Sequence, residues 1–125
     1  MAKEEEWPET LDALIAAPRN HTLLFENEFV RVLDTRVAPG ETVPPHTHRW
    51  PGALYFLTWS DCVRRDLDGA VVMDSRSTGL ALEGKAIWSG PLVPHTLENV
   101  GDRELRAISV EVKDRSEPHT LRSTD

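Results

Sequence analysis

The chain has 125 residues, of which 39% are hydrophobic and 28% are charged, and this balance is typical of a single folded domain. Its formal net charge of −7 repels phosphate backbones, which argues against a nucleic-acid partner. No apolar run approaches the roughly 20 residues of a membrane-spanning helix, so no membrane partner is expected.

The N-terminal segment and the single cysteine predict a compartment for the protein. Residues 1–6 are acidic overall and lack the cationic and apolar regions of a signal peptide. Cys62 has no second cysteine with which to form a disulfide, as is usual in a reducing compartment. We therefore expect a cytoplasmic protein with one domain over residues 1–125, a core over about 22–113 and a polar tail over 114–125.

Residues 9–17 are the segment that most favours a helix. Leu11, Leu14 and Ile15 follow the i, i+3, i+4 spacing of one helical face, and Pro18 ends the segment. A helix this short is marginal on its own, so we expect it to pack against the rest of the domain.

Short β-rich runs separated by turn residues follow from residue 22 onward. Asp68-Gly69 favours a tight hairpin, because both turn positions tolerate a positive φ angle. The expected strands cover residues 29–37, 54–59, 63–67, 70–73, 79–82, 85–88, 95–99 and 104–113. Many short strands, with no second helical segment for parallel crossovers, predict an all-β sandwich or barrel.

His46-Thr47-His48 is the motif that most directly indicates chemistry. Side chains alternate along a strand, so two histidines one residue apart project from the same face and can bind one ion together. His95, which follows a segment rich in proline and glycine, is a candidate third ligand. The alternative is that the pair lies on the surface and that His95 is packed in the core.

The spacing around these histidines resembles the two motifs of the cupin superfamily, whose members are small double-stranded β-helix barrels. Gly40, five residues and then His46-Thr47-His48 match the opening of the first motif. Gly84 opens the second motif, and the run from His95 to Asn99 closes it. Residues 24–32 are also similar to the start of small bacterial cupins of β-alanine degradation. The resemblance implies an all-β, jelly-roll-like cupin barrel with a short N-terminal helix, assembled as a homodimer.

The chain departs from the first cupin motif where the family has a glutamate ligand. That ligand should fall near Gly52, and Trp50-Pro51-Gly52-Ala53 contains no carboxylate. Three neutral imidazoles leave the charge of a divalent ion uncompensated, which favours an anionic ligand such as a carboxylate or an enolate.

The resemblance leaves two functions open and does not decide whether the chain is an enzyme. In the first, a divalent Fe, Zn, Ni or Mn ion on His46, His48 and His95 acts on a small anionic metabolite. The chain would then be a three-histidine dioxygenase, isomerase or lyase. In the second, the barrel has lost tight metal binding and binds or senses a small molecule without catalysis.

Aromatic and polar residues near the motifs are candidates for the rest of the site. Tyr55 is a candidate proton donor in catalysis. The candidates for the substrate pocket are Trp50, Phe56, Trp59, Trp88 and Asn99. Each aromatic residue could equally fill the core, and Asn99 could equally hold a turn. His21 and His119 lie in polar terminal segments, and we expect both to be solvated.

Overall fold

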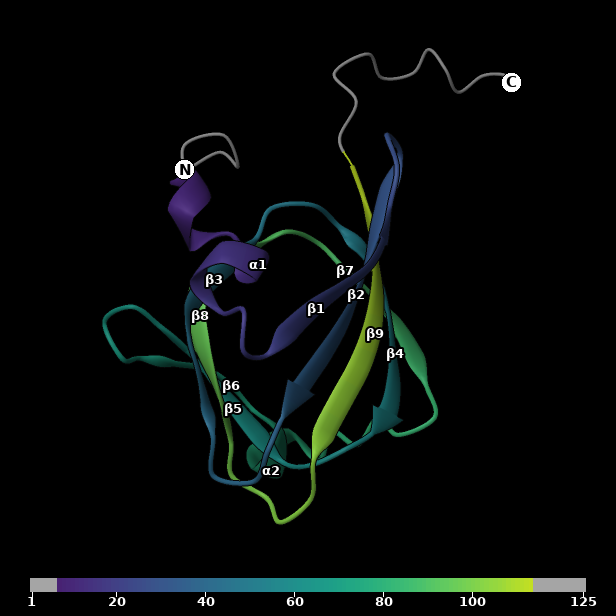
Figure 1. Ribbon diagram of the computed structural model, residues 1–125. Helices are drawn as coiled ribbons and strands as arrows, with labels where there is room; N and C mark the ends of the chain where they lie inside the picture. Colours follow the sequence, from purple (N-terminus) through teal and green to yellow (C-terminus); the bar gives the residue numbers. More distant parts are fainter. Residues whose placement is uncertain (1–6, 114–125) are drawn as a thin grey trace.

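The computed structural model describes residues 7–113, which form two antiparallel β-sheets that face each other (Figure 1). The first sheet has the strand order β1 (His21–Glu26), β2 (Val30–Val37), β9 (Leu105–Val112), β4 (Gly52–Thr58) and β7 (Ala86–Ser89). The second sheet has the order β3 (Thr42–His48), β8 (Leu92–Asn99), β5 (Cys62–Asp66) and β6 (Val71–Asp74). The expected all-β architecture is confirmed.

The segment expected to be one helix is instead a 3₁₀ turn at Glu9–Leu11 followed by a short helix, α1 (Ala13–Ala16). Asp12 separates the two, because its backbone is extended and its side chain accepts a hydrogen bond from the backbone N–H of Leu14 at 3.1 Å. This is the usual role of an aspartate at a helix N-cap. The segment packs against β3, so the short helix is held by tertiary contacts as predicted.

Most of the predicted strands are present, with ends shifted by a few residues. The Asp68-Gly69 turn connects β5 and β6 as expected, and Gly69 has a φ angle of 89°. The prediction of a strand over residues 79–82 is wrong. Residues 79–82 follow helix α2 (Ser75–Thr78) without forming a strand, and the chain leaves the helix through Gly79, whose φ angle of 73° is the left-handed conformation common at helix ends.

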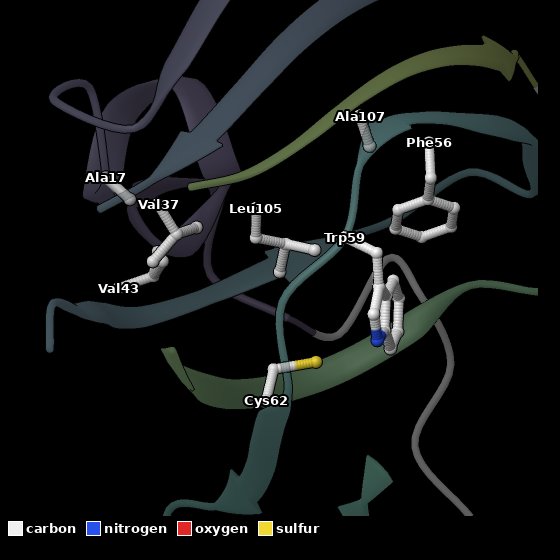
Figure 2. Close-up of a cluster of buried hydrophobic side chains, with 8 residues drawn as sticks. All are labelled: Ala17, Val37, Val43, Phe56, Trp59, Cys62, Leu105 and Ala107. Carbon is white, nitrogen blue, oxygen red and sulfur yellow. The ribbon is translucent and has the colours of Figure 1, made fainter. Parts of the chain in front are cut away.

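The hydrophobic core lies between the two sheets and includes Ala17, the residue that follows α1 (Figure 2). Val37, Leu105 and Ala107 from the first sheet point toward Val43 and Cys62 from the second (Figure 2). The remaining members of the cluster are Ala17, Phe56 and Trp59. Because the core fills only part of the barrel, the remainder is free for the polar residues described below.

The outer face of the first sheet carries apolar side chains in register. Pairing across the strands aligns Phe25, Val32, Val110, Ala53 and Trp88, with one residue from each of the five strands. Trp88 is 64% exposed and Phe25 is 53% exposed, so this row lies open on the surface. No helix within residues 7–113 is long and apolar enough to cross a membrane.

Candidate metal centre

Four imidazole rings from three strands come together inside the barrel. His46 and His48 lie on β3, His95 lies opposite His46 on β8, and His21 begins β1. Ring centroids are 4.3 Å apart for His46 and His95, and 5.0 Å apart for both His21–His46 and His46–His48. Within the described residues, ring nitrogens of His21, His46 and His48 lie within 4.8 Å of one another, as the ligands of one ion would.

His21 was expected to be solvated, and this prediction is wrong. His21 is only 4% exposed. It is the first residue of β1, and the pairing of β1 with β2 places its ring against His46 and His48 of β3. His119, the other histidine expected to be solvated, lies outside the described residues.

Each of the four rings is oriented by a hydrogen bond at its Nδ1 atom. Three of these atoms face backbone carbonyl oxygens, with Nδ1–O distances of 3.0 Å for His21, 2.8 Å for His46 and 2.7 Å for His95. The Nδ1 of His48 lies 2.8 Å from a carboxylate oxygen of Glu111. An oxygen of either kind accepts a hydrogen bond, so in a neutral ring the proton is on Nδ1 and the lone pair is on Nε2. All four Nε2 atoms therefore carry a free lone pair, although the group of mutually close ring nitrogens contains His21, His46 and His48 and does not include His95.

Burial keeps the imidazoles of His21, His46 and His95 neutral near pH 7. It lowers the pKa of His21 to about 4 and that of His46 to about 2, with a further lowering by neighbouring histidines. The pKa of His95 is lowered to about 4 for the same main reason, although its hydrogen bond to Val93 opposes the shift. Because the neutral ring is the form that binds metal, the cluster is ready to coordinate at neutral pH.

A buried chain of charged side chains is hydrogen-bonded to the Nδ1 atom of His48. Glu111 on β9 bonds His48 through Oε2, and its Oε1 accepts a hydrogen bond of 2.6 Å from Nε of Arg31. Arg31 in turn donates two hydrogen bonds to Asp12, at 2.8 and 3.1 Å. Although burial acts to raise the pKa of Glu111, its bonds to His48 and Arg31 lower it overall, so the carboxylate is ionised.

Gly52 cannot carry the acidic ligand expected from the cupin motif. It pairs with Glu111 across β4 and β9, and a Cβ atom at this position would collide with the carbonyl oxygen of Val110. The same Cβ would lie only 2.9 Å from the Cα of Glu111. The close strand spacing thus excludes a side chain at Gly52, and the carboxylate nearest the histidines belongs to Glu111.

The N-terminal segment contributes directly to the geometry of the cluster. Asp12 forms a bridge with Thr47, the residue between the two histidines of β3, and the Thr47 hydroxyl donates to the carbonyl of Leu11 at 3.3 Å. Ala17, at the end of α1, supplies the carbonyl that orients His21. The positions of three of the four histidines, His21, His46 and His48, therefore depend on the turn and helix that precede β1.

A cavity of about 100 Å³ opens beside the histidines. Its polar wall contains His21, His46, His48, Glu111 and three hydroxyl residues, Thr35, Ser89 and Ser109. The apolar wall contains Trp50, Leu54, Phe56, Leu92, Leu105 and Ala107, and Gly52 and Gly90 complete the lining. The Oγ atom of Ser109 is buried and has no hydrogen-bond partner among the described residues. The mostly apolar wall of the cavity therefore contains a buried hydroxyl without a protein partner.

The structure brings only some of the predicted pocket residues to this cavity. Trp50 and Phe56 line it, whereas Trp59 packs in the core and Trp88 is exposed on the outer face. Tyr55 also points outward, paired with Ile108 and 45% exposed, so we do not place it at the metal centre.

Asn99 holds a turn instead of lining the cavity. Its Nδ2 donates to the carbonyls of Val37 and Arg103, and its Oδ1 accepts from Ser60 and from the backbone of Gly101. Asn99 is fully buried and all of its hydrogen-bonding groups are used, which leaves none for a ligand.

Comparison with known proteins supports the fold. No family model and no curated protein matches the chain. A cupin domain from Bordetella pertussis is 22% identical, with a TM-score of 0.61 over 75% of this chain and 92% of that chain. An RmlC-like cupin with a double-stranded β-helix from Methanocaldococcus jannaschii is 16% identical, with a TM-score of 0.53 over 74% of this chain and 79% of that one.

The polyketide cyclase RemF from Streptomyces resistomycificus has the same architecture. It is 21% identical, with a TM-score of 0.53 over 80% of this chain and 69% of RemF. None of these likenesses indicates β-alanine degradation. Together with the two facing sheets, they show that the chain has the double-stranded β-helix fold of the cupin superfamily.

Proposed function

We propose that the chain binds one divalent transition-metal ion through the Nε2 atoms of His21, His46, His48 and His95. The orientation of the four rings carries this proposal, since every Nδ1 has an acceptor and every Nε2 is left free. Histidine ligands of metals usually have such a partner on the second ring nitrogen. A histidine that only fills a core has no need of three imidazole neighbours.

The donor set and the nearby charges fit such an ion. Imidazole nitrogen suits Zn, Fe, Ni and Mn among the divalent metals considered. Asp12, Arg31 and Glu111 together carry one net negative charge, which partly balances the ion without a carboxylate in its coordination sphere. An octahedral ion with four imidazole ligands keeps two positions for water or an organic ligand.

We propose further that the protein acts on a small organic molecule in the adjacent cavity. The ion would supply Lewis-acid polarisation of a ligand oxygen atom. The apolar wall excludes water, and the free hydroxyl of Ser109 orients the molecule. The likeness to a polyketide cyclase supports chemistry on an organic molecule within this fold. Isomerase, lyase and dioxygenase reactions are all compatible with this arrangement.

Metal analysis of protein prepared without a histidine tag tests the proposal. We expect about one equivalent of metal after dialysis against Zn, Fe, Ni or Mn salts, and loss of that metal in His46→Ala. Tyr55→Phe is the control, because Tyr55 lies on the outer face and should not affect metal content. Wild-type protein that takes up none of the four ions would contradict the proposal. Such a result would favour the alternative, a cupin that binds its ligand without metal.

We also propose that the protein is a homodimer through the outer face of its first sheet. The aligned row of Phe25, Val32, Val110, Ala53 and Trp88 crosses all five strands and is apolar throughout. Contiguous apolar surface of this kind marks an interaction site in soluble proteins.

A further inference from the structure

Arg64 is an arginine side chain inside the barrel, next to the metal centre. It lies on β5, where residue pairs with β8 place Cys62 opposite Asn99 and Arg64 opposite Leu97. Cys62 and Asn99 are buried between the sheets, and Leu97 packs against the core. Because paired residues share a face, Arg64 also points inward.

This guanidinium has no partner among the described residues. Arg31, Arg36, Arg65, Arg76, Arg103 and Arg106 each form hydrogen bonds with a carboxylate, Arg19 lies 3.6 Å from one, and Arg49 stacks on Trp50. The Arg64 side chain takes part in no hydrogen bond, ion pair or ring contact within residues 7–113, although the residue is half-buried. Burial lowers its pKa, which shows that its charge is poorly solvated. A partly desolvated charge without a counterion is stabilised by an anion, so this position favours an anionic ligand.

A cleft of about 200 Å³ is lined by both this side chain and His95. Arg64 and Asp66 lie on one side, and Val72, Pro91, Leu92, Val93, Pro94 and His95 complete the wall. His95 is one of the proposed metal ligands, and its pKa is lowered by burial and further by the nearby positive charge of Arg64. Leu92 lines both this cleft and the metal cavity, so the two spaces are neighbours.

Asp66 does not neutralise Arg64. Its Oδ1 accepts hydrogen bonds of 2.9 Å from the backbone N–H groups of both Asp68 and Ala70, and it forms no ion pair with Arg64. The carboxylate is therefore used in closing the hairpin turn, as is common for aspartate. Its presence still adds a negative charge to the cleft, which disfavours a ligand with two negative charges.

We propose that Arg64 binds the carboxylate group of a small organic monocarboxylate, whose apolar body lies against the valine and proline side chains of this cleft. The planar fork of a guanidinium matches a carboxylate through two parallel hydrogen bonds. One arginine beside one aspartate suits a single negative charge rather than a phosphate. The inference rests on the proposed function for the metal ion. It deepens that function because it names the class of ligand held beside His95.

Calorimetric titration of benzoate into wild-type protein tests the inference, with benzamide as the neutral analogue. We expect benzoate to bind, and benzamide and inorganic phosphate to bind at least 10-fold more weakly, as loss of hydrogen bonds to a charged group implies. Arg64→Gln should weaken benzoate binding by at least 10-fold, and Arg64→Lys should have an intermediate effect. The matched control is Arg65→Gln, which removes the neighbouring arginine that is paired with Glu98.

Three results would overturn the inference: no benzoate binding to wild type, equal binding by Arg64→Gln, or a preference for phosphate. The comparison of benzoate with benzamide uses wild-type protein only, so it remains decisive if a variant does not fold. The titrations are made on both chelator-treated and zinc-loaded protein. If the wild-type protein takes up no zinc, the proposed metal site is contradicted. Benzoate binding that depends on Arg64 would in that case still support the anion site.

Discussion

The Nδ1 of His48 lies 2.8 Å from Oε2 of Glu111, and this contact joins the histidine cluster to the central strand of the first sheet. The carboxylate fixes which nitrogen of His48 carries the proton and makes the other nitrogen a stronger ligand. Arg31 holds the second oxygen of the same carboxylate, so Glu111 cannot rotate away. The acid missing from the first motif is thus replaced by one that acts through a histidine.

Glu111→Gln should weaken metal binding without abolishing it. The amide can still accept a hydrogen bond but carries no charge, and loss of such a partner typically lowers metal affinity about 10- to 100-fold. Competition with a zinc-binding dye measures the change. The control is Glu98→Gln, since Glu98 pairs with Arg65 on the protein surface. Equal zinc affinity in Glu111→Gln and wild type would show that this carboxylate does not support the site.

His21→Ala separates a four-histidine centre from the three-histidine centre expected from the sequence. If His21 is a ligand, the variant keeps the ion on three nitrogens with lower affinity, and one more water enters the coordination sphere. Cobalt substitution reports this change, because the visible absorption of Co²⁺ depends on its ligands and geometry. An unchanged cobalt spectrum in the variant would mean that His21 lies near the ion without binding it.

Metal-free protein should lose stability as the pH falls from about 6.5 to about 4. The pKa values of His21 and His95 are lowered to about 4 in the folded chain, from an ordinary value of 6.5. Between these limits the unfolded chain binds protons that the folded chain does not, so the free energy of unfolding decreases with falling pH. Urea denaturation of chelator-treated protein across this range measures the slope. His21→Gln should make it shallower, and a slope that is the same in both proteins would contradict the assignment.

Two serine variants distinguish a free hydroxyl from a structural one. Ser109→Ala removes a buried oxygen without a partner, so stability should stay the same or rise by up to about 1 kcal/mol. Ser60→Ala removes the donor of a 2.7 Å hydrogen bond to the buried Asn99 and should cost about 1–3 kcal/mol. Thermal denaturation compares the pair. A larger loss for Ser109→Ala than for Ser60→Ala would show that the Ser109 hydroxyl is bonded within the fold.

Val110→Lys should dissociate the proposed homodimer. The lysine would place a charge in the middle of the apolar row on the first sheet, where its desolvation opposes association. Sedimentation velocity measures the oligomeric state. Val72→Lys is the control, because Val72 is 54% exposed on the second sheet. A wild-type monomer, or a Val110→Lys dimer, would contradict the proposed interface.

Most of the strands and the histidine pair could be predicted from the sequence, because they depend on local patterns. Alternation along residues 104–113 indicated β9, and the spacing of His46 and His48 placed both side chains on one face. The short run at 79–82 was misleading, since four apolar or small residues fit a turn as well as a strand.

The remainder of the site depends on contacts between distant segments. His21 lies between Asn20 and Thr22, and nothing in that polar setting indicates that β1 will carry it over β3. Glu111 alternates with Val110 and Val112, and only the pairing of β9 with β2 and β4 shows that the acid faces inward. Gly52 was an indirect indication of this arrangement. A glycine at the position of an expected ligand can mean that a neighbouring strand lies too close for any side chain.

The position of β9 sets the time at which the metal centre forms during synthesis. All four histidines emerge from the ribosome before residue 96, but β9 must insert between β2 and β4 to complete the first sheet. Until then Arg31 and His48 lack Glu111, and the two halves of that sheet have no strand to join them. Tight metal binding should therefore follow the insertion of β9, because only then does His48 gain the carboxylate that orients it.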